Sequence, residues 1–243
     1  MLHNKNFVLF VVLPVCANLI LIGMYFSGNQ FAQYLVAPQF DWLHHRSWRE
    51  FGLLEQMQNA FLLTIVFLFA IEVIKRPSLL EKAFFLCGGL VMLFLLLEEL
   101  DYGIHFYEYF NGQESTIEVK QRNWHNRDIS GRSINGRLKK ISSLLMAFWF
   151  MVCPLLSSRV NFKVLSNIIP SRWFVVAFAL VILFSSLTHY LDDLGLADID
   201  GVAGGLEGNI SEFRETSTYY LYLLYAIQLI TTKDLFSWSA RET

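Results

Sequence analysis

Two adjacent glutamates, Glu98 and Glu99, follow the long apolar run AFFLCGGLVMLFLLL of residues 83–97. An apolar run of this length predicts a membrane-spanning helix, in which an unpaired charge is costly to bury. Both carboxylates also fall at the C-terminal, negative end of the helix dipole, which disfavours them. Asp101 adds a third acid close by. Such a group needs a metal ion, another cation, a shared proton or a water-filled cavity, and we expect function at this end of the helix.

Other acids and histidines fall at helix ends that we expect on the same face of the membrane. If the helix continues past Glu99, spacing at i, i+3, i+4 and i+7 puts Glu98, Asp101, Tyr102 and His105 on one stripe. The sequence therefore predicts a cavity between helices, lined by polar side chains from several of them. The candidate cavity cluster is Glu55, Glu98, Glu99, Asn123, His125, Asn126, Glu212 and Glu215.

Carboxylates and histidines that converge inside a helical bundle are typical ligands of Zn²⁺ or of a di-metal centre. We therefore treat a divalent metal as a candidate cofactor, with Glu98, Glu99 and His125 as its first candidate ligands. Weaker candidates are His105, His189 and Asp192.

Each of these groups also has a purely structural interpretation. Glu98 and Glu99 are expected to form ion pairs with arginines of the next loop if they have no other role. Acids in the first turn of a helix, such as Glu55, Glu212 and Glu215, are favoured by the helix dipole alone. The interpretation of these residues as a site and the structural one both remain open at this stage.

Composition places these residues in a membrane protein. Hydrophobic residues make up 54% of the 243 residues and charged residues 16%, and the net charge of −2 gives no reason to expect nucleic-acid binding. Apolar segments indicate an all-α integral membrane bundle of six transmembrane helices in a single domain covering residues 1–243, with a long external loop at 101–140. The predicted spans lie near residues 7–26, 54–74, 83–100, 141–157, 173–191 and 216–230.

Basic residues favour one orientation of this bundle. The short connections at 75–82 and 159–172 each carry three Lys or Arg residues. The positive-inside rule then predicts both termini in the cytoplasm and a multi-pass protein of the inner membrane. The loop at 101–140 is also basic, which argues against this orientation, although the grouping of helix ends holds either way.

Two short motifs carry a family resemblance. The sequence Glu-Glu-Leu-Asp-Tyr-Gly-Ile at 98–104 and the sequence Asn-Trp-His-Asn at 123–126 resemble a group of uncharacterised bacterial polytopic inner-membrane proteins. That group carries E-E-I-S-W-G-Q at a helix end and N-L-H-N in the next loop. The stretch Glu-Phe-Gly-Leu-Leu-Glu at 50–55 and the pair Glu212 and Glu215 are similar to further elements of the group. The resemblance implies a site at these positions and no particular reaction.

Three classes of function fit these patterns. The first is an enzyme or metal-binding protein that acts on a lipid or lipid-linked substrate. The second is a structural or accessory subunit of a larger membrane assembly, with lipid and partner subunits around it. The third is an ion or proton transporter. Whether the chain is an enzyme stays open, and we expect His125 to fold back within hydrogen-bond or shared-ligand distance of Glu98 or Glu99.

Overall fold

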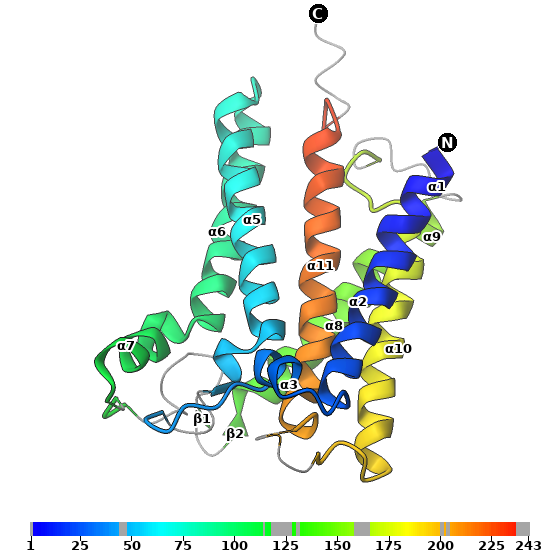
Figure 1. The fold of residues 1–243 in the computed structure, drawn as a ribbon. Coiled ribbons are helices and arrows are strands. Elements are labelled where there is room, and N and C mark those ends of the chain that lie inside the picture. The colour runs from blue at the N-terminus through cyan, green and yellow to red at the C-terminus, as the bar shows by residue number, and fades with distance from the viewer. Residues whose placement is uncertain are drawn as a thin grey trace, which may run out of the picture.

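The computed structural model describes residues 2–43, 48–113, 115–117, 128–129, 132–157, 166–199, 202 and 205–236. They form a helical bundle (Figure 1), and the predicted all-α class is confirmed. Within these ranges, strand structure is limited to the antiparallel pairing of β1 (Asp128–Ile129) with β2 (Arg132–Ser133). The α-helices are α1 (Leu2–Phe7), α2 (Leu13–Tyr25), α3 (Gln30–Val36), α5 (Leu53–Lys75), α6 (Leu79–Glu99), α7 (Ile104–Asn111), α8 (Ile134–Ala147), α9 (Cys153–Leu156), α10 (Trp173–Asp193) and α11 (Ile210–Thr231). Short π- or 3-10 helices are η1 (Val8–Val12), η2 (Arg49–Phe51), η3 (Asp101–Gly103), η5 (Phe148–Val152) and η6 (Glu207–Asn209).

Four helices in the described part of the chain are long and apolar enough to cross a membrane. They are Lys5–Tyr25, which runs through α1, η1 and α2, and the helices α5, α6 and α10. Large apolar side chains lie exposed on them, including Leu90 and Phe94 of α6. In a soluble protein such an apolar surface would be unfavourable, whereas a lipid environment accommodates it. The chain is therefore a helical membrane protein with four candidate spans.

The two other predicted spans differ from the expectation. The segment Lys140–Leu156 is apolar but shorter than the four, and it belongs to a longer helix that begins at Ile134 as α8. Helix α11 begins at Ile210 rather than near residue 216, so its acidic first turns are part of the helix. It lies centrally in the bundle, between α5 and α10 (Figure 1), and buries Thr216, Ser217 and Thr218. Its polar side chains meet protein rather than lipid.

Proline shapes the first long helix. Pro14 has no N–H, and η1 before it is a π-helix in which the Leu13 N–H donates to the Val8 carbonyl. This leaves the Leu9 carbonyl without its usual partner, and the Tyr220 hydroxyl of α11 donates to it at 2.8 Å. Asn18 Nδ2 donates to the Pro14 carbonyl at 2.8 Å, as expected for a side chain that helps to satisfy the local backbone. The proline kink is thus tied to α11.

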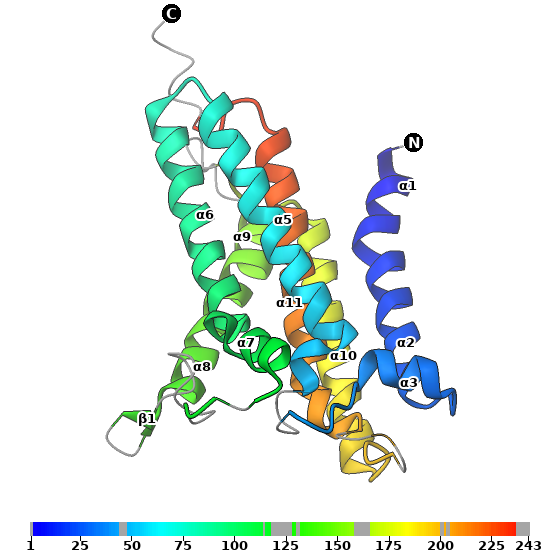
Figure 2. The same ribbon diagram turned by 60° about the vertical axis from the view of Figure 1, so that its left-hand side comes forward.

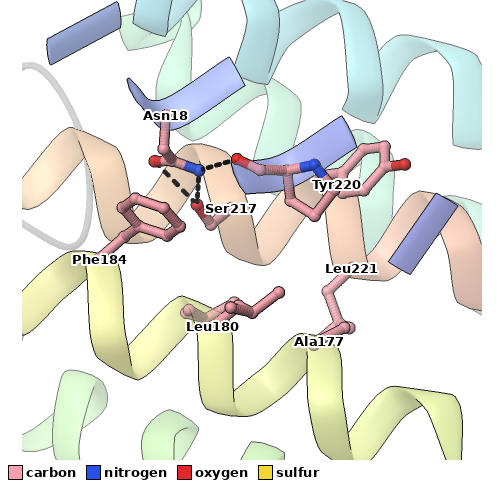
Figure 3. Close-up of a pocket in the computed structure, with 9 residues that line it drawn as sticks. Asn18, Ala177, Leu180, Phe184, Ser217, Tyr220 and Leu221 are labelled. Carbon is pink, nitrogen blue, oxygen red and sulfur yellow. Dashed lines mark hydrogen bonds between the residues drawn. The ribbon is translucent and has the colours of Figure 1, made fainter. Parts of the chain in front are cut away.

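A small pocket lies beside this kink, between α2, α10 and α11. Its walls are mostly apolar, and Asn18 and Ser217 lie together on one side of it (Figure 3), with 3.2 Å between Asn18 Nδ2 and Ser217 Oγ. Interhelical hydrogen bonds of this kind hold membrane helices together at about 0.6 kcal/mol each. The pair helps to fix α2 against α11.

Four helix ends gather at one end of the bundle. Helices α5 and α11 begin there, and α6 and α10 end there (Figures 1 and 2). The same-face grouping predicted from the sequence is therefore present. The opposite end holds the start of α1 and the end of α11 (Figure 1).

Candidate functional site

Arg49 is surrounded by carboxylates from three segments of the chain. Its guanidinium nitrogens lie 3.5 Å from Glu50 Oε1, 3.4 Å from Glu55 Oε1 and 3.4 Å from Glu212 Oε1. These separations exceed the 2.7–2.9 Å that is typical of a charge-assisted hydrogen bond. One cation is thus shared loosely by three acids, two of which, Glu55 and Glu212, have side chains only 3% and 4% exposed.

The local fold places Arg49 there because of a close backbone approach. Arg49 and Glu50 belong to η2, and Gly52 is the residue that precedes α5. A Cβ atom at Gly52 would lie 2.8 Å from the carbonyl oxygen of Val36, at the end of α3, and 3.0 Å from that of Arg49. Only glycine fits this contact without a shift of the backbone. Helix α3 therefore packs directly against the turn that carries Arg49.

Two further helices complete the cluster. Gln58 Nε2 of α5 donates to Glu212 Oε2 at 3.0 Å, and the Ser211 hydroxyl donates to Glu212 Oε1 at 2.9 Å. Glu99, the last residue of α6, accepts a hydrogen bond from the Tyr219 hydroxyl of α11. Glu99 also lies within electrostatic reach of Glu50 and Glu212. We call this group the Arg49 cluster: Arg49, Glu50, Glu55, Gln58, Glu99 and Glu212.

Charge is unbalanced in the Arg49 cluster. Among the described residues, Arg49 is the one cation at ion-pair distance from Glu50, Glu55 and Glu212, and Glu99 is the fourth carboxylate of the cluster. Burial raises the pKa of Glu50 to about 8, with Asp101 and Glu212 adding to the rise and Arg49 opposing it. Burial alone would lower the pKa of Arg49, yet Glu212, Glu50 and Glu55 hold it above its ordinary value. Near neutral pH the arrangement therefore retains a proton on Glu50 and keeps Arg49 charged.

The chain turns sharply after Glu99, and the predicted straight stripe is wrong at this point. Helix α6 ends at Glu99, and Asp101, Tyr102 and Gly103 follow with φ values of 45°, 53° and 85°. Left-handed conformations are costly for the two residues that carry a Cβ atom. The turn nevertheless lets the Tyr102 hydroxyl donate to Glu98, at the expected i+4 spacing.

Helix α7 carries its own buried polar face beyond this turn. His105 and Glu108 are 1% and 0% exposed, and the His105 ring packs against Phe51 and Phe106. Glu108 Oε1 accepts a hydrogen bond from the Ser115 backbone N–H at 2.7 Å. The first part of the long loop is thus a separate short helix.

The structure separates other predicted candidates from the Arg49 cluster. His189 and Asp192 lie exposed near the end of α10, where His189 Nδ1 is 2.7 Å from the Ser185 carbonyl oxygen. Glu215 is partly exposed and pairs with its neighbour Arg214 at 3.6 Å, and it remains within electrostatic reach of Glu99 and Arg49. The structure therefore brings together Glu55, Glu99 and Glu212 of the predicted set, with Glu215 at the edge of the cluster and Glu98 directly before Glu99 in α6.

Three predicted residues, Asn123, His125 and Asn126, lie outside the described residues, as do His44 and His45. The expected contact of His125 with Glu98 or Glu99 stays a prediction. Within the described residues, no three His, Cys, Asp or Glu side chains are grouped as a metal site would require.

Sequence reasoning missed Arg49 and Gln58. Arg49 carried a usable signal, since a cation directly before a helix meets the positive end of the dipole, the mirror image of the anomaly at Glu98 and Glu99. Gln58 is an ordinary residue for a helix, and only its contact with Glu212, 154 positions away, makes it part of the cluster. Tyr219 follows Glu212 and Glu215 on one helical stripe, and only the structure shows its hydrogen bond to Glu99.

The geometry supports reversible binding of a positive charge. Buried carboxylates that outnumber their cations hold protons or attract a cation, and the partly exposed Arg49 and Glu50 leave the cluster in contact with the surface. Comparison of the chain with family models, curated proteins and solved structures found no match, so the resemblance to polytopic bacterial membrane proteins stays a prediction.

Proposed function

We propose that this protein binds and releases protons, or a cation that takes their place, at the Arg49 cluster, as carriers and conductors of ions do. The observation that carries the proposal is the sharing of one guanidinium by Glu50, Glu55 and Glu212 at the end of a membrane bundle. Ion pathways are where carboxylates are retained in membrane helices in spite of the cost of burial.

Polar side chains along α11 support a pathway rather than an isolated ion pair. After Glu212, α11 buries the side chains of Thr216 and Ser217, and the Ser217 hydroxyl accepts a hydrogen bond from Asn18 of α2. These groups continue from the cluster toward the interior of the bundle. A purely structural helix in the same place would gain more from apolar packing.

The topology that we propose with this function has six crossings, with α8–α9 and α11 added to the four candidate spans. Helix α1 begins and α11 ends at the same end of the bundle (Figure 1), as an even number of crossings requires. The basic residues between α5 and α6 favour a cytoplasmic location of that end and insertion in the inner membrane. The Arg49 cluster would then face the outside.

The test is ion flux in liposomes that contain the purified protein and a pH-sensitive dye. With a proton or Na⁺ gradient, the wild type should equilibrate ions faster than empty liposomes, and Glu212→Gln should lose most of this flux. Asp193→Asn is the matched control, because Asp193 is an exposed acid at the same end of the bundle. Wild-type liposomes that are no more permeable than empty ones would contradict the proposal.

A further inference from the structure

Three buried oxygen atoms on one face of α5 have no hydrogen-bond donor within the described residues. They are Glu55 Oε2, Gln58 Oε1 and Asn59 Oδ1. Positions i, i+3 and i+4 share one face of a helix, so the three oxygens lie along the first turns of α5. Glu55 and Gln58 are 2% and 0% exposed. Buried acceptors are normally satisfied, and each exception calls for an explanation.

Rotation of the Gln58 amide group by 180° would not satisfy its hydrogen-bonding groups. Its Nε2 donates to Glu212 Oε2 at 3.0 Å. Exchange of the amide nitrogen and oxygen would turn the amide oxygen toward that carboxylate, so that two acceptors would face each other. The free amide oxygen of Gln58 is therefore fixed by the contact with Glu212.

A proton alone would not satisfy this face. Protonation of Glu55 supplies one donor, but the amide oxygens of Gln58 and Asn59 do not take up protons near neutral pH. All three atoms are hard oxygen ligands of the kind that alkali and alkaline-earth cations prefer. A single cation on this face would offer positive charge to all three oxygens at once.

The charge count selects the class of cation. Arg49 pairs with Glu55 and Glu212, so these three groups together carry a net charge of −1 when all are ionised. A monovalent cation brings the charge of these three groups to zero, whereas a divalent ion would bring it to +1 and would need Glu50, the third acid beside Arg49, to be ionised as well.

We propose that Glu55, Gln58 and Asn59 form a binding site for a monovalent alkali cation, Na⁺ or K⁺, on the first turns of α5. This inference rests on the proposed function and names the ion that would exchange with protons there. Arg49, whose side chain is 40% exposed, lies 3.4 Å from Glu55 Oε1 and connects the site with the surface of the protein.

The experiment measures thermal unfolding of the purified protein in nanodiscs while NaCl or KCl replaces choline chloride at constant ionic strength. The wild type should become more stable as the alkali cation concentration rises, and the effect should saturate. Gln58→Met and Asn59→Ala should each weaken the apparent affinity about tenfold or more. Gln30→Met makes the same change at an exposed residue of α3 and should keep the wild-type response.

The outcomes separate this inference from the proposed function. No difference between choline and alkali cations, or stabilisation by Ca²⁺ or Mg²⁺ alone, would overturn the alkali-cation site. If Glu212-dependent proton flux were then still present, the proposed function would survive without it. Cation stabilisation that is lost in Gln58→Met, in a protein without flux, would instead establish the site and contradict the proposed function.

Discussion

The two ends of the bundle use the same residue types with opposite results. At the far end, Arg76 is 7% exposed, and its Nε lies 2.6 Å from Oε2 of Glu72, four residues earlier in the chain. Its Nη1 donates to the Lys233 carbonyl at 2.6 Å, and Glu81 lies 3.6 Å away. Glu81 in turn accepts a hydrogen bond from the Leu235 backbone N–H at 2.8 Å. We call Arg76, Glu72 and Glu81 the Arg76 cluster.

The Arg76 cluster has two carboxylates for its one cation, whereas the Arg49 cluster has four carboxylates, contacts of 3.4–3.5 Å to its cation, and buried oxygen atoms without a donor among the described residues. Arg76 also bonds the last carbonyls of α11 and lies over the Phe85 ring, 5.1 Å from its centroid. A cation at a helix C-terminus is favoured by the dipole, and Arg49 before a helix is not. The comparison teaches that the ion pairs of the Arg76 cluster hold helices together, while the Arg49 cluster keeps capacity for another positive charge.

Removal of Arg76 should have the largest effect on stability. Arg76→Met leaves Glu72 and Glu81 buried without their cation, a change that costs about 3–5 kcal/mol in comparable buried pairs. Unfolding in detergent by heat or denaturant would measure it. Lys75→Met is the control, since Lys75 is an exposed neighbour. Equal stability of the two variants would remove the structural role given to the Arg76 cluster.

The second-largest expected effect is a pH dependence of stability that arises from the Arg49 cluster. The pKa of Glu50 is raised from 4.5 to about 8, so the folded chain holds an extra proton between these values. Its free energy of unfolding should therefore fall as pH rises through this window, by at most about 1.36 kcal/mol for each pKa unit. Glu50→Gln should flatten the profile measured by thermal unfolding, and Asp193→Asn should not. A wild-type profile that is flat from pH 5 to 8 would refute the retained proton.

Loss of Arg49 should cost less than loss of Arg76. The Arg49 side chain is 40% exposed and its contacts are long, so Arg49→Met should destabilise the fold by about 1.5–3 kcal/mol, as for hydrogen bonds to charged groups. Denaturant unfolding of both arginine variants side by side gives the comparison. A greater loss for Arg49→Met would reverse our assignment of the two clusters.

The smallest expected effect concerns the close contact that supports the Arg49 cluster. Gly52→Ala places a Cβ atom 2.8 Å from the Val36 carbonyl oxygen, and the required shift should cost about 1–3 kcal/mol in thermal unfolding. Gly23→Ala is the control, because nothing lies within 4 Å of that position. If Gly52→Ala were as stable as Gly23→Ala, α3 would not be packed tightly on this turn.

The sequence by itself determined the helical class, the four apolar spans and the end of the bundle where the acids gather. Apolar runs and helix-end charges are local patterns, and the Glu72–Arg76 pair follows from i+4 spacing alone. Even the anomaly at Glu99 was visible, because its position at the end of an apolar run is a property of the chain.

Only the tertiary structure decided which side chains form hydrogen bonds with these acids. Tyr219 reaches Glu99 across 120 residues, Gln58 reaches Glu212 across 154, and neither distance leaves a trace in local spacing. The sequence placed Glu212 in the first turn of a helix, but it did not show that the polar side chains of α11 are buried among other helices. The positive φ values at Asp101 and Tyr102 also arise from packing, which overrides the helical preference of the stripe.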